Sequence, residues 1–221
     1  MSSERFSELS ELIAGLGRSH RDSGPARADL DPDPLEQFAR WIEDAIEAGV
    51  PLPNTMTLAT ATSEGRPSAR QVLLKGLDKN GFVFFTNYGS RKAAELEANP
   101  RAALVFHWAA VERQVRAVGR VARLGRVETQ EYWATRDRAS RLGAWASRQS
   151  APVSGRAELE AGLAEAAARF DGVDVPLPEF WGGYRVDPDE MEFWEGRPNR
   201  LHDRWTYRRT ADGWEIARLA P

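Results

Sequence analysis

The chain has 221 residues, of which 42% are hydrophobic and 29% charged, with a formal net charge of −3. This composition is typical of an ordinary soluble domain, and the chain is long enough to bury a core without staples. The lack of cysteine excludes disulfides and thiolate metal sites, and three histidines leave little for a histidine-rich metal site. The charge argues against nucleic acid, and no apolar run approaches the ~20 residues of a membrane span. We therefore expect a cytoplasmic protein.

The N-terminal residues 1–33 are predicted to form a mobile arm. Within it, residues 7–16 carry apolar side chains at helical spacing and are predicted to form a short helix. Residues 17–34 are rich in glycine, proline, aspartate and arginine, which is typical of a mobile segment. A single domain is expected over residues 34–221.

This domain is predicted to consist of short strands with helices inserted between them. A helix begins at Pro34, which Asp33 precedes as an N-cap, and it ends at Gly49. Period-two alternation predicts strands over residues 55–62, 68–77, 82–86, 102–108, 114–124, 182–186, 191–194, 201–207 and 214–219. Helical spacing predicts helices over residues 90–99, 127–135, 139–145 and 158–170. The pattern indicates a mostly-β, α+β fold built on an antiparallel barrel.

Arg70 and Lys75 lie at the two ends of a predicted strand whose middle is apolar. They have opposite parity, so a regular strand would direct them to opposite sides. A bulge or a strand end would be needed to bring both to one ligand. The alternative is that both are surface cations whose stems cover apolar residues.

Arg91 and Lys92 open the helix that follows Ser90. The positive end of the helix dipole normally favours acidic residues there. Cations are explained in this place if an anion such as a phosphate binds beside the backbone N–H groups. Local pairing with Glu95 or Glu97 explains them as well, and the sequence leaves both interpretations open.

Tyr132, Arg136 and Ser140 recur at a spacing of four on a predicted helix with a turn, which places them on one face. Two hydroxyls and a guanidinium on one face are suited to grip a second phosphate, although a solvated helix face has the same pattern. Gln149 and Ser150 add an amide and a hydroxyl in a loop.

Arg200, His202 and Arg204 recur at a spacing of two in a predicted strand and would share one of its faces. This row is either an anion site or a solvated basic face. Neighbouring tryptophans, Trp194 and Trp205 among them, indicate that this end of the chain is folded into the core.

No Ser-His-Asp arrangement, carboxylate pair or glycine-rich dinucleotide fingerprint accompanies these cations. Two phosphate-like sites without hydrolytic machinery indicate a phosphorylated cofactor and a phosphorylated substrate. The chemistry would then belong to the cofactor, and no metal is needed.

Together these segments resemble the FMN-dependent pyridoxamine/pyridoxine 5′-phosphate oxidase family over about residues 28–221. The ordered matches are Arg70 to Lys75, Phe85-Thr86 with Ser90-Arg91-Lys92, Glu112-Arg113-Gln114-Val115, Gly143-Ala144-Trp145, Gln149-Ser150, Pro176-Leu177-Pro178 with Phe180-Trp181-Gly182-Gly183, Glu192-Phe193-Trp194, Arg200-Leu201-His202-Asp203-Arg204 and Arg218-Leu219-Ala220-Pro221. The resemblance implies an FMN-binding split β-barrel that forms a homodimer, with FMN in clefts at the subunit interface.

The resemblance also implies which residues touch each ligand. The FMN contacts would be Arg70, Gln71, Val72, Leu73, Leu74, Lys75, Phe85, Thr86, Arg91, Lys92, Gln114, Gln149, Ser150, Trp194 and Arg204, with Gln149 and Ser150 expected from the partner chain. Lys75, Tyr132, Arg136 and Ser140 would hold the substrate phosphate. Arg200 and His202 would be the catalytic pair over the substrate's pyridine ring.

The implied reaction oxidises pyridoxamine or pyridoxine 5′-phosphate to pyridoxal 5′-phosphate. Hydride passes to the flavin, and dioxygen reoxidises the flavin and yields hydrogen peroxide. With the amine, the resulting imine is hydrolysed by water and releases ammonia. Residues 17–22 depart from the family, because they lack the tyrosine of its closing segment. The alternatives are a phenazine-type flavin oxidase with an unphosphorylated substrate and a non-catalytic FMN-binding protein. The retained Lys75, Tyr132, Arg136 and Ser140 favour the vitamin B6 phosphate.

Overall fold

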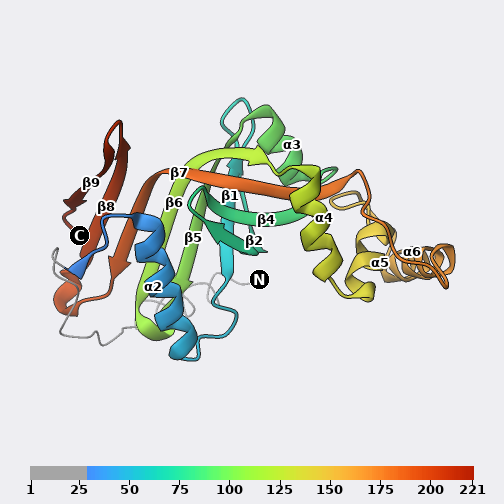
Figure 1. Cartoon of the computed structure of the whole chain (residues 1–221), viewed down its shortest axis with the longest axis horizontal. Coiled ribbons are helices and arrows are strands. Elements are labelled where there is room, and N and C mark those ends of the chain that lie inside the picture. Colours follow the sequence, from blue (N-terminus) through green and yellow to red (C-terminus); the bar gives the residue numbers. More distant parts are fainter. Residues whose placement is uncertain (1–28) are drawn as a thin grey trace, which may run out of the picture.

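The computed structural model describes residues 29–221, and an antiparallel sheet dominates it (Figure 1). Its strands are β1 (Thr55–Ala61), β2 (Pro67–Leu73), β3 (Gly76–Asp78), β4 (Gly81–Asn87), β5 (Arg101–Trp108), β6 (Arg113–Arg123), β7 (Trp181–Glu195), β8 (Asp203–Thr210) and β9 (Gly213–Arg218). The strand order is β2-β1-β5-β6-β7-β4-β3, and β8 pairs with β7 and β9 with β8. The predicted antiparallel, mostly-β fold is confirmed. The predicted helix at 7–16 and most of the arm lie outside the described residues.

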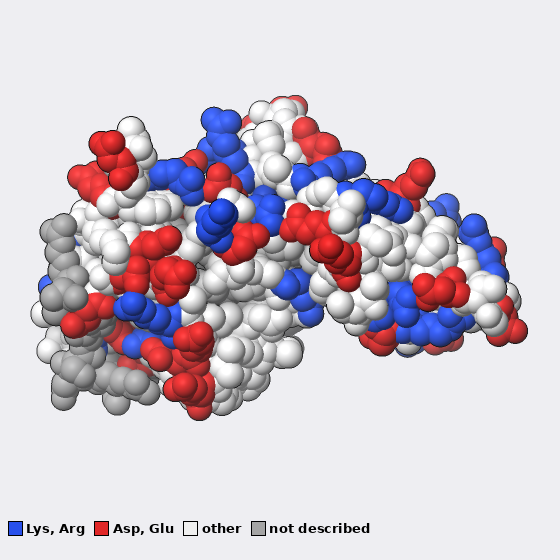
Figure 2. Space-filling model, in the orientation of Figure 1, with Lys and Arg blue, Asp and Glu red and all other residues white. Residues whose placement is uncertain are grey.

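The helices are α2 (Pro34–Glu47), α3 (Arg91–Ala98), α4 (Arg126–Thr135), α5 (Arg138–Ala146) and α6 (Arg156–Arg169). Figure 1 shows α2 at one side of the sheet and α4 to α6 extending from the other end. On the face drawn in Figure 2, basic and acidic side chains of the described residues are interspersed rather than separated by sign.

Helix α2 is anchored to the sheet by aromatic packing. The Asp33 carboxylate accepts the N–H of Leu35 at 2.8 Å and so satisfies one of the open donors at the start of the helix. One turn further, the fully buried ring of Phe38 lies 4.9 Å from that of Phe82 and 4.7 Å from that of Phe106. These contacts place the main core between α2 and strands β4 and β5.

A second apolar cluster joins the helices α4 to α6 to the beginning of β7. Its buried members are Trp133, Phe170, Val175, Leu177 and Trp181. The indole N–H of Trp133 donates to the carbonyl of Val175 at 2.9 Å, so the proline-rich segment before β7 is tied to α4. This cluster fixes α4 beside β4 and β7, where it forms one wall of the cavity described below.

Strand β7 is one long strand, whereas the sequence predicted two strands at residues 182–186 and 191–194. The pairing of β6 with β7 changes register between Val118 and Gly119, which accommodates Pro188 within a continuous ladder. A Cβ atom on Gly119 would lie 2.0 Å from the carbonyl oxygen of Asp187, so this close approach requires glycine. The bulge therefore keeps β7 continuous.

The tail segment also differs from the prediction. Strand β8 begins at Asp203, and Arg200 lies before it in the short 3₁₀ turn Pro198–Arg200 with φ of +61°. The expectation that Arg200, His202 and Arg204 alternate along one strand is therefore wrong, because only Arg204 belongs to the strand.

Candidate functional site

A cavity of about 620 Å³ lies between β2, β4, the start of α3, α4 and the loop at residues 149–150. Its lining residues are Ser68, Ala69, Arg70, Gln71, Val72, Leu73, Lys75, Phe85, Thr86, Asn87, Arg91, Lys92, Tyr132, Arg136, Gln149, Ser150 and Trp181. Most residues expected to contact FMN or the substrate phosphate thus meet in one place. We call it the cationic cavity, because Arg70, Lys75, Arg91, Lys92 and Arg136 all line it.

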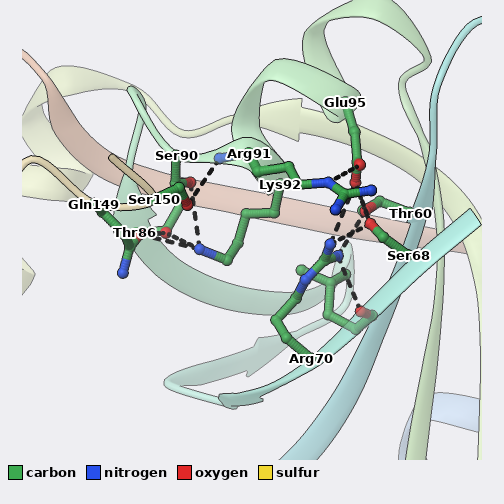
Figure 3. A network of polar contacts seen from close by, with 11 residues as sticks. Thr60, Ser68, Arg70, Thr86, Ser90, Arg91, Lys92, Glu95, Gln149 and Ser150 are labelled. Carbon is green, nitrogen blue, oxygen red and sulfur yellow. Dashed lines mark hydrogen bonds and ion pairs between the residues drawn. The ribbon is translucent and has the colours of Figure 1, made fainter. Parts of the chain in front are cut away.

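Glu95 is the buried carboxylate behind this cavity (Figure 3). Its Oε2 accepts hydrogen bonds from the hydroxyls of Thr60 and Ser68 and from the guanidinium of Arg70 at 3.2 Å. Its Oε1 accepts from Arg91 Nε at 2.8 Å. One carboxylate therefore orients two arginines that come from different elements, β2 and α3.

The ionisation of Glu95 is set by two opposing effects. Burial alone would raise its pKa, but the hydrogen bonds from Ser68, Thr60, Arg91 and Arg70 outweigh burial and lower the pKa to about 2. Glu95 is therefore a carboxylate at neutral pH and supplies negative charge to the arginines beside it.

Lys92 is buried and has a different environment. Its ammonium donates to the hydroxyls of Thr86 at 3.1 Å and Ser90 at 3.3 Å, and to Gln149 Oε1 at 3.0 Å. Within residues 29–221 no carboxylate pairs with it. Burial, and then repulsion from Arg70, lower its pKa to about 8. A buried cation without a counter-charge is suited to an anionic ligand.

The two interpretations of the α3 cations are thereby separated. Arg91 follows the local one, since it pairs with Glu95 four residues on. Glu97 pairs instead with Arg123 at 2.8 Å. Lys92 has no such local partner among the described residues and keeps the anion-site interpretation.

Lys75 reaches the cavity because the predicted strand 68–77 is interrupted. Strand β2 ends at Leu73 and β3 begins at Gly76, while the N–H of Lys75 donates to the carbonyl of Val83 at 2.8 Å. Because of this break, the two residues do not lie on one regular strand that would direct them to opposite sides. Arg70 and Lys75 therefore line the same cavity.

The expected single helical face of Tyr132, Arg136 and Ser140 is wrong. Helix α4 ends at Thr135 and Arg136 is extended, with ψ of 142°. Tyr132 and Arg136 line the cavity, whereas the Ser140 hydroxyl donates to the carboxylate of Asp137 at 2.7 Å and lies outside the lining. A contact between Ser140 and a substrate phosphate stays a prediction.

Stacked aromatic rings form the apolar wall of the cavity. The ring of Phe85 lies 3.8 Å from that of Tyr132 and 5.4 Å from that of Trp181, all nearly parallel. The guanidinium of Arg136 lies 4.7 Å above the Trp181 ring. The sequence did not identify Trp181 or Glu95 as site residues. Spacing of four between Arg91 and Glu95 was the available signal for the latter.

Gln149 and Ser150 line the cavity of their own chain, and their expected contribution from the partner chain stays a prediction. Gln149 Oε1 accepts from the hydroxyl of Thr86 at 2.9 Å as well as from Lys92. The Ser150 hydroxyl accepts the backbone N–H of Arg91 at 3.2 Å.

Leu74, which was also expected to contact FMN, is buried in the main core and does not line the cavity. Five other predicted residues form a separate group, the tail row. Gln114, Trp194 and Arg204 lie opposite one another across β6, β7 and β8. The imidazole of His202 lies 4.6 Å from the Trp194 ring, and Arg200 is exposed in the preceding turn. None of these five residues lines the cationic cavity.

The two groups stand far apart on the same strand. Trp181 in the cavity wall is at one end of β7, and Trp194 is near the other end. At roughly 3.3 Å per residue the path along the strand is about 40 Å. Figure 1 shows β7 crossing the molecule between α4 and β8. A single chain therefore does not bring the tail row to its own cavity.

Comparison with known proteins gives this arrangement a family. A family model described as pyridoxamine 5′-phosphate oxidase matches residues 42–169. A second, described as the pyridoxine 5′-phosphate oxidase C-terminal dimerisation region, matches residues 181–221. The chain belongs to the pyridoxamine 5′-phosphate oxidase family, as the sequence predicted.

Named relatives cover nearly the whole chain. A pyridoxine/pyridoxamine 5′-phosphate oxidase of Rubrobacter xylanophilus is 58% identical, over 95% of this chain and 96% of the relative. One of Cupriavidus metallidurans is 52% identical, over 95% of this chain and 99% of the relative.

Two solved structures share the fold. PhzG from Burkholderia lata, in complex with tetrahydrophenazine-1-carboxylic acid, has a TM-score of 0.86 and 34% identity, covering 92% of this chain and 100% of its own. A pyridoxamine 5′-phosphate oxidase-related, FMN binding protein from Nostoc punctiforme has a TM-score of 0.68 at 18% identity and covers 83% of this chain and 97% of its own. The second likeness concerns the fold alone.

Two further properties concern the described residues only. No helix within residues 29–221 is both long and apolar enough to cross a membrane. The same residues contain no cluster of histidine, aspartate or glutamate side chains arranged to hold a metal ion.

Replacing Glu95 by glutamine is expected to destabilise the protein by about 2 kcal/mol at pH 7, because charged hydrogen bonds to Arg70 and Arg91 are lost. The pKa of Glu95 is lowered on folding, so its contribution is full above pH 4.5 and is lost as the pH falls toward 2. Urea unfolding of the wild type and of Glu95→Gln between pH 7 and 3 measures the difference in their free energies of unfolding. This difference should become smaller as the pH falls.

The matched control is Glu97→Gln on the same helix, which weakens a half-exposed pair with Arg123 and keeps an oxygen that can accept from the Tyr184 hydroxyl, so it is expected to cost less than about 1 kcal/mol. An equal loss in the two variants, or a difference that does not depend on pH, would contradict the role given to Glu95.

Proposed function

We propose that the chain is an FMN-dependent oxidase that converts pyridoxamine or pyridoxine 5′-phosphate to pyridoxal 5′-phosphate, with dioxygen as the electron acceptor and hydrogen peroxide as a product. The family and the named relatives confirm the predicted enzyme class and FMN as cofactor. The observation that carries the proposal is the meeting of two cation groups, Arg70 with Lys92 and Lys75 with Arg136, in one cavity. A cytoplasmic location belongs to the same proposal.

The FMN phosphate fits beside Lys92 and Arg70. The buried ammonium of Lys92 has no carboxylate partner among the described residues, and the Arg91 N–H at the start of α3 faces only the Ser150 hydroxyl. A phosphate gains charge-assisted hydrogen bonds from such groups. When bound, FMN supplies a flavin ring that accepts a hydride and passes electrons to dioxygen.

The substrate phosphate fits beside Lys75, Tyr132 and Arg136, on the other wall of the cavity. The Tyr132 ring is held by stacking on Phe85, and Arg136 lies over Trp181, so both side chains are positioned before a ligand arrives. Holding a phosphate at each wall aligns the two ligands, and such alignment lowers the barrier to hydride transfer.

A second copy of the chain is needed to complete the site. Four of the five tail-row residues, Trp194, Arg200, His202 and Arg204, lie within residues 181–221, the region that the dimerisation family model matches, and Gln114 pairs with Trp194 from the neighbouring strand β6. In the proposed homodimer, Gln114, Trp194 and Arg204 of one chain contact the FMN held in the cavity of the other. Arg200 and His202 of that same chain then reach the substrate ring.

A phenazine-type oxidase is the second candidate, because the PhzG structure superposes well on this chain. The ligand in that structure is a carboxylic acid without a phosphate. The lining of the cavity by Lys75, Tyr132 and Arg136 favours a phosphorylated substrate, as do the names of the more similar relatives. A non-catalytic FMN-binding protein would not require Arg200 and His202.

Turnover of the B6 phosphates tests the proposal directly. The FMN-loaded protein in air is expected to form pyridoxal 5′-phosphate and hydrogen peroxide in equal amounts from either substrate. Unphosphorylated pyridoxine should give a kcat/KM at least about 100-fold lower, because charge-assisted contacts to the phosphate are lost. No turnover of either phosphate by protein that carries FMN would refute the assignment.

FMN affinity should depend on the charge of Lys92. Below pH 8 its ammonium attracts the phosphate, and above pH 8 it loses the proton, so the affinity is expected to fall by up to about tenfold per pH unit. The phosphate itself is already doubly charged above about pH 6. Flavin fluorescence titrations from pH 7 to 9.5 measure the dissociation constant.

Lys92→Met should bind FMN more weakly and with no pH dependence over this range. Lys79→Met, which removes an exposed lysine in the β3–β4 turn, should keep the wild-type profile. A wild-type affinity that is constant up to pH 9.5 would contradict the role of Lys92.

Mixed dimers test the shared site. Arg136→Ala damages the cavity and Arg200→Ala damages the tail row, so each homodimer should be nearly inactive. Random reassortment makes half of the dimers mixed, and each mixed dimer has one intact site, so about a quarter of wild-type activity should return. The control mixture of Arg136→Ala with Lys75→Ala should recover nothing. Differently tagged chains verify the exchange, and exchange without recovery would place the whole site within one chain.

A further inference from the structure

We propose that Arg197 is a positioning residue, which holds the turn carrying Arg200 and His202 and fixes the nitrogen on which His202 carries its proton. This inference rests on the proposed function, which places Arg200 and His202 at the substrate. Arg197 itself lies outside the cationic cavity and outside the tail row.

Arg197 is a buried cation that bridges the end of β7 and the start of β8. Its Nε donates to Asp203 Oδ2 at 2.6 Å and its Nη2 to Glu195 Oε2 at 2.5 Å. Glu195 and Asp203 are themselves opposite each other in the β7–β8 ladder. The guanidinium therefore ties together the two residues between which the chain leaves and re-enters the sheet.

The same residue contacts His202 through its backbone. The N–H of Arg197 donates to His202 Nδ1 at 3.1 Å. An imidazole nitrogen that accepts this bond carries no proton, so the neutral ring carries its proton on Nε2. The ring also packs 4.6 Å from Trp194. His202 is thus held in one tautomer, with its proton on Nε2.

The turn between Arg197 and His202 contains residues in a left-handed backbone conformation, which needs surrounding contacts to stabilise it. Asn199 has φ of +57° and Arg200 has φ of +61°. Left-handed conformations at residues other than glycine cost of order 1 kcal/mol or more and persist where surrounding contacts hold them. The buried ion pairs of Arg197 supply such contacts at the base of the turn.

Arg197 is not the sole cationic partner of the two carboxylates that it bridges. Glu195 Oε1 also accepts from Arg113 Nε at 3.0 Å, and Asp203 also pairs with Arg218. Removing the Arg197 side chain therefore leaves each buried carboxylate with a cation. The fold should survive the substitution, while the turn loses its attachment.

The kinetic test compares Arg197→Met and Arg197→Lys with the control Arg208→Met, which removes an exposed arginine paired with Glu190 on the same two strands. Arg197→Met is expected to lower kcat/KM by about 10- to 100-fold with a much smaller change in FMN affinity, since misplacing a reacting group by about 1 Å has an effect of this size. Arg197→Lys should recover part of the loss, and the control should match the wild type.

A double-mutant cycle with His202→Gln separates positioning from general stability. If Arg197 acts through His202, adding Arg197→Met to His202→Gln should lower kcat/KM by much less than it does in the wild type. Equal losses in both backgrounds would overturn the proposal. So would a wild-type kcat/KM in Arg197→Met.

A spectroscopic test does not depend on turnover. In ¹⁵N-histidine NMR spectra the His202 signals, identified by their loss in His202→Gln, should show the Nε2–H tautomer in the wild type and a mixture of tautomers in Arg197→Met. An Nδ1–H tautomer in the wild type would overturn the proposal. If the wild type fails to oxidise either B6 phosphate while the NMR result holds, the proposed function is wrong, but the role of Arg197 in holding the turn and the His202 tautomer is retained.

Discussion

The site depends on the concentration of positive charge at a place that is partly closed to water. Arg70, Arg91 and Lys92 converge on the start of α3, and mutual repulsion would drive such side chains apart. The buried carboxylate of Glu95 prevents this for the two arginines, since it accepts hydrogen bonds from both. Its low pKa keeps that negative charge present at neutral pH. The cavity is therefore ready for an anion before one arrives.

The length of β7 imposes the second constraint. The strand contributes Trp181 to the cavity and Trp194 to the tail row, and it is continuous because Gly119 lets a bulge form opposite Pro188. A rigid paired strand does not fold back on itself. Each chain therefore presents the cationic cavity and the tail row at different places, and most of the tail row lies within the region that the dimerisation family model matches.

Local patterns in the sequence were enough to predict most strands and helices, because alternation and helical spacing report directly on burial. They failed where a few residues between elements take an irregular conformation. The breaks at Leu74–Lys75 and Arg136, and the left-handed Arg200, depend on contacts with distant parts of the chain, which spacing does not reveal. The cavity cations were identified as unusual charges. Glu95 was not assigned to the site, because the residue type alone does not show whether a glutamate is buried or exposed.

Arg70, Arg91 and Lys92 differ in their hydrogen-bond partners, and this difference indicates which of them would contribute most to binding an anion. Arg70 and Arg91 already have a carboxylate partner, so an incoming phosphate would share them with Glu95. Among residues 29–221, Lys92 is held only by neutral oxygens of Thr86, Ser90 and Gln149, which satisfy its N–H groups without cancelling its charge. Its lowered pKa is the cost of that arrangement, and a bound dianion would reverse it. Lys92 would thus be the cation whose protonation changes most on binding of an anion, while the arginines remain fixed by Glu95.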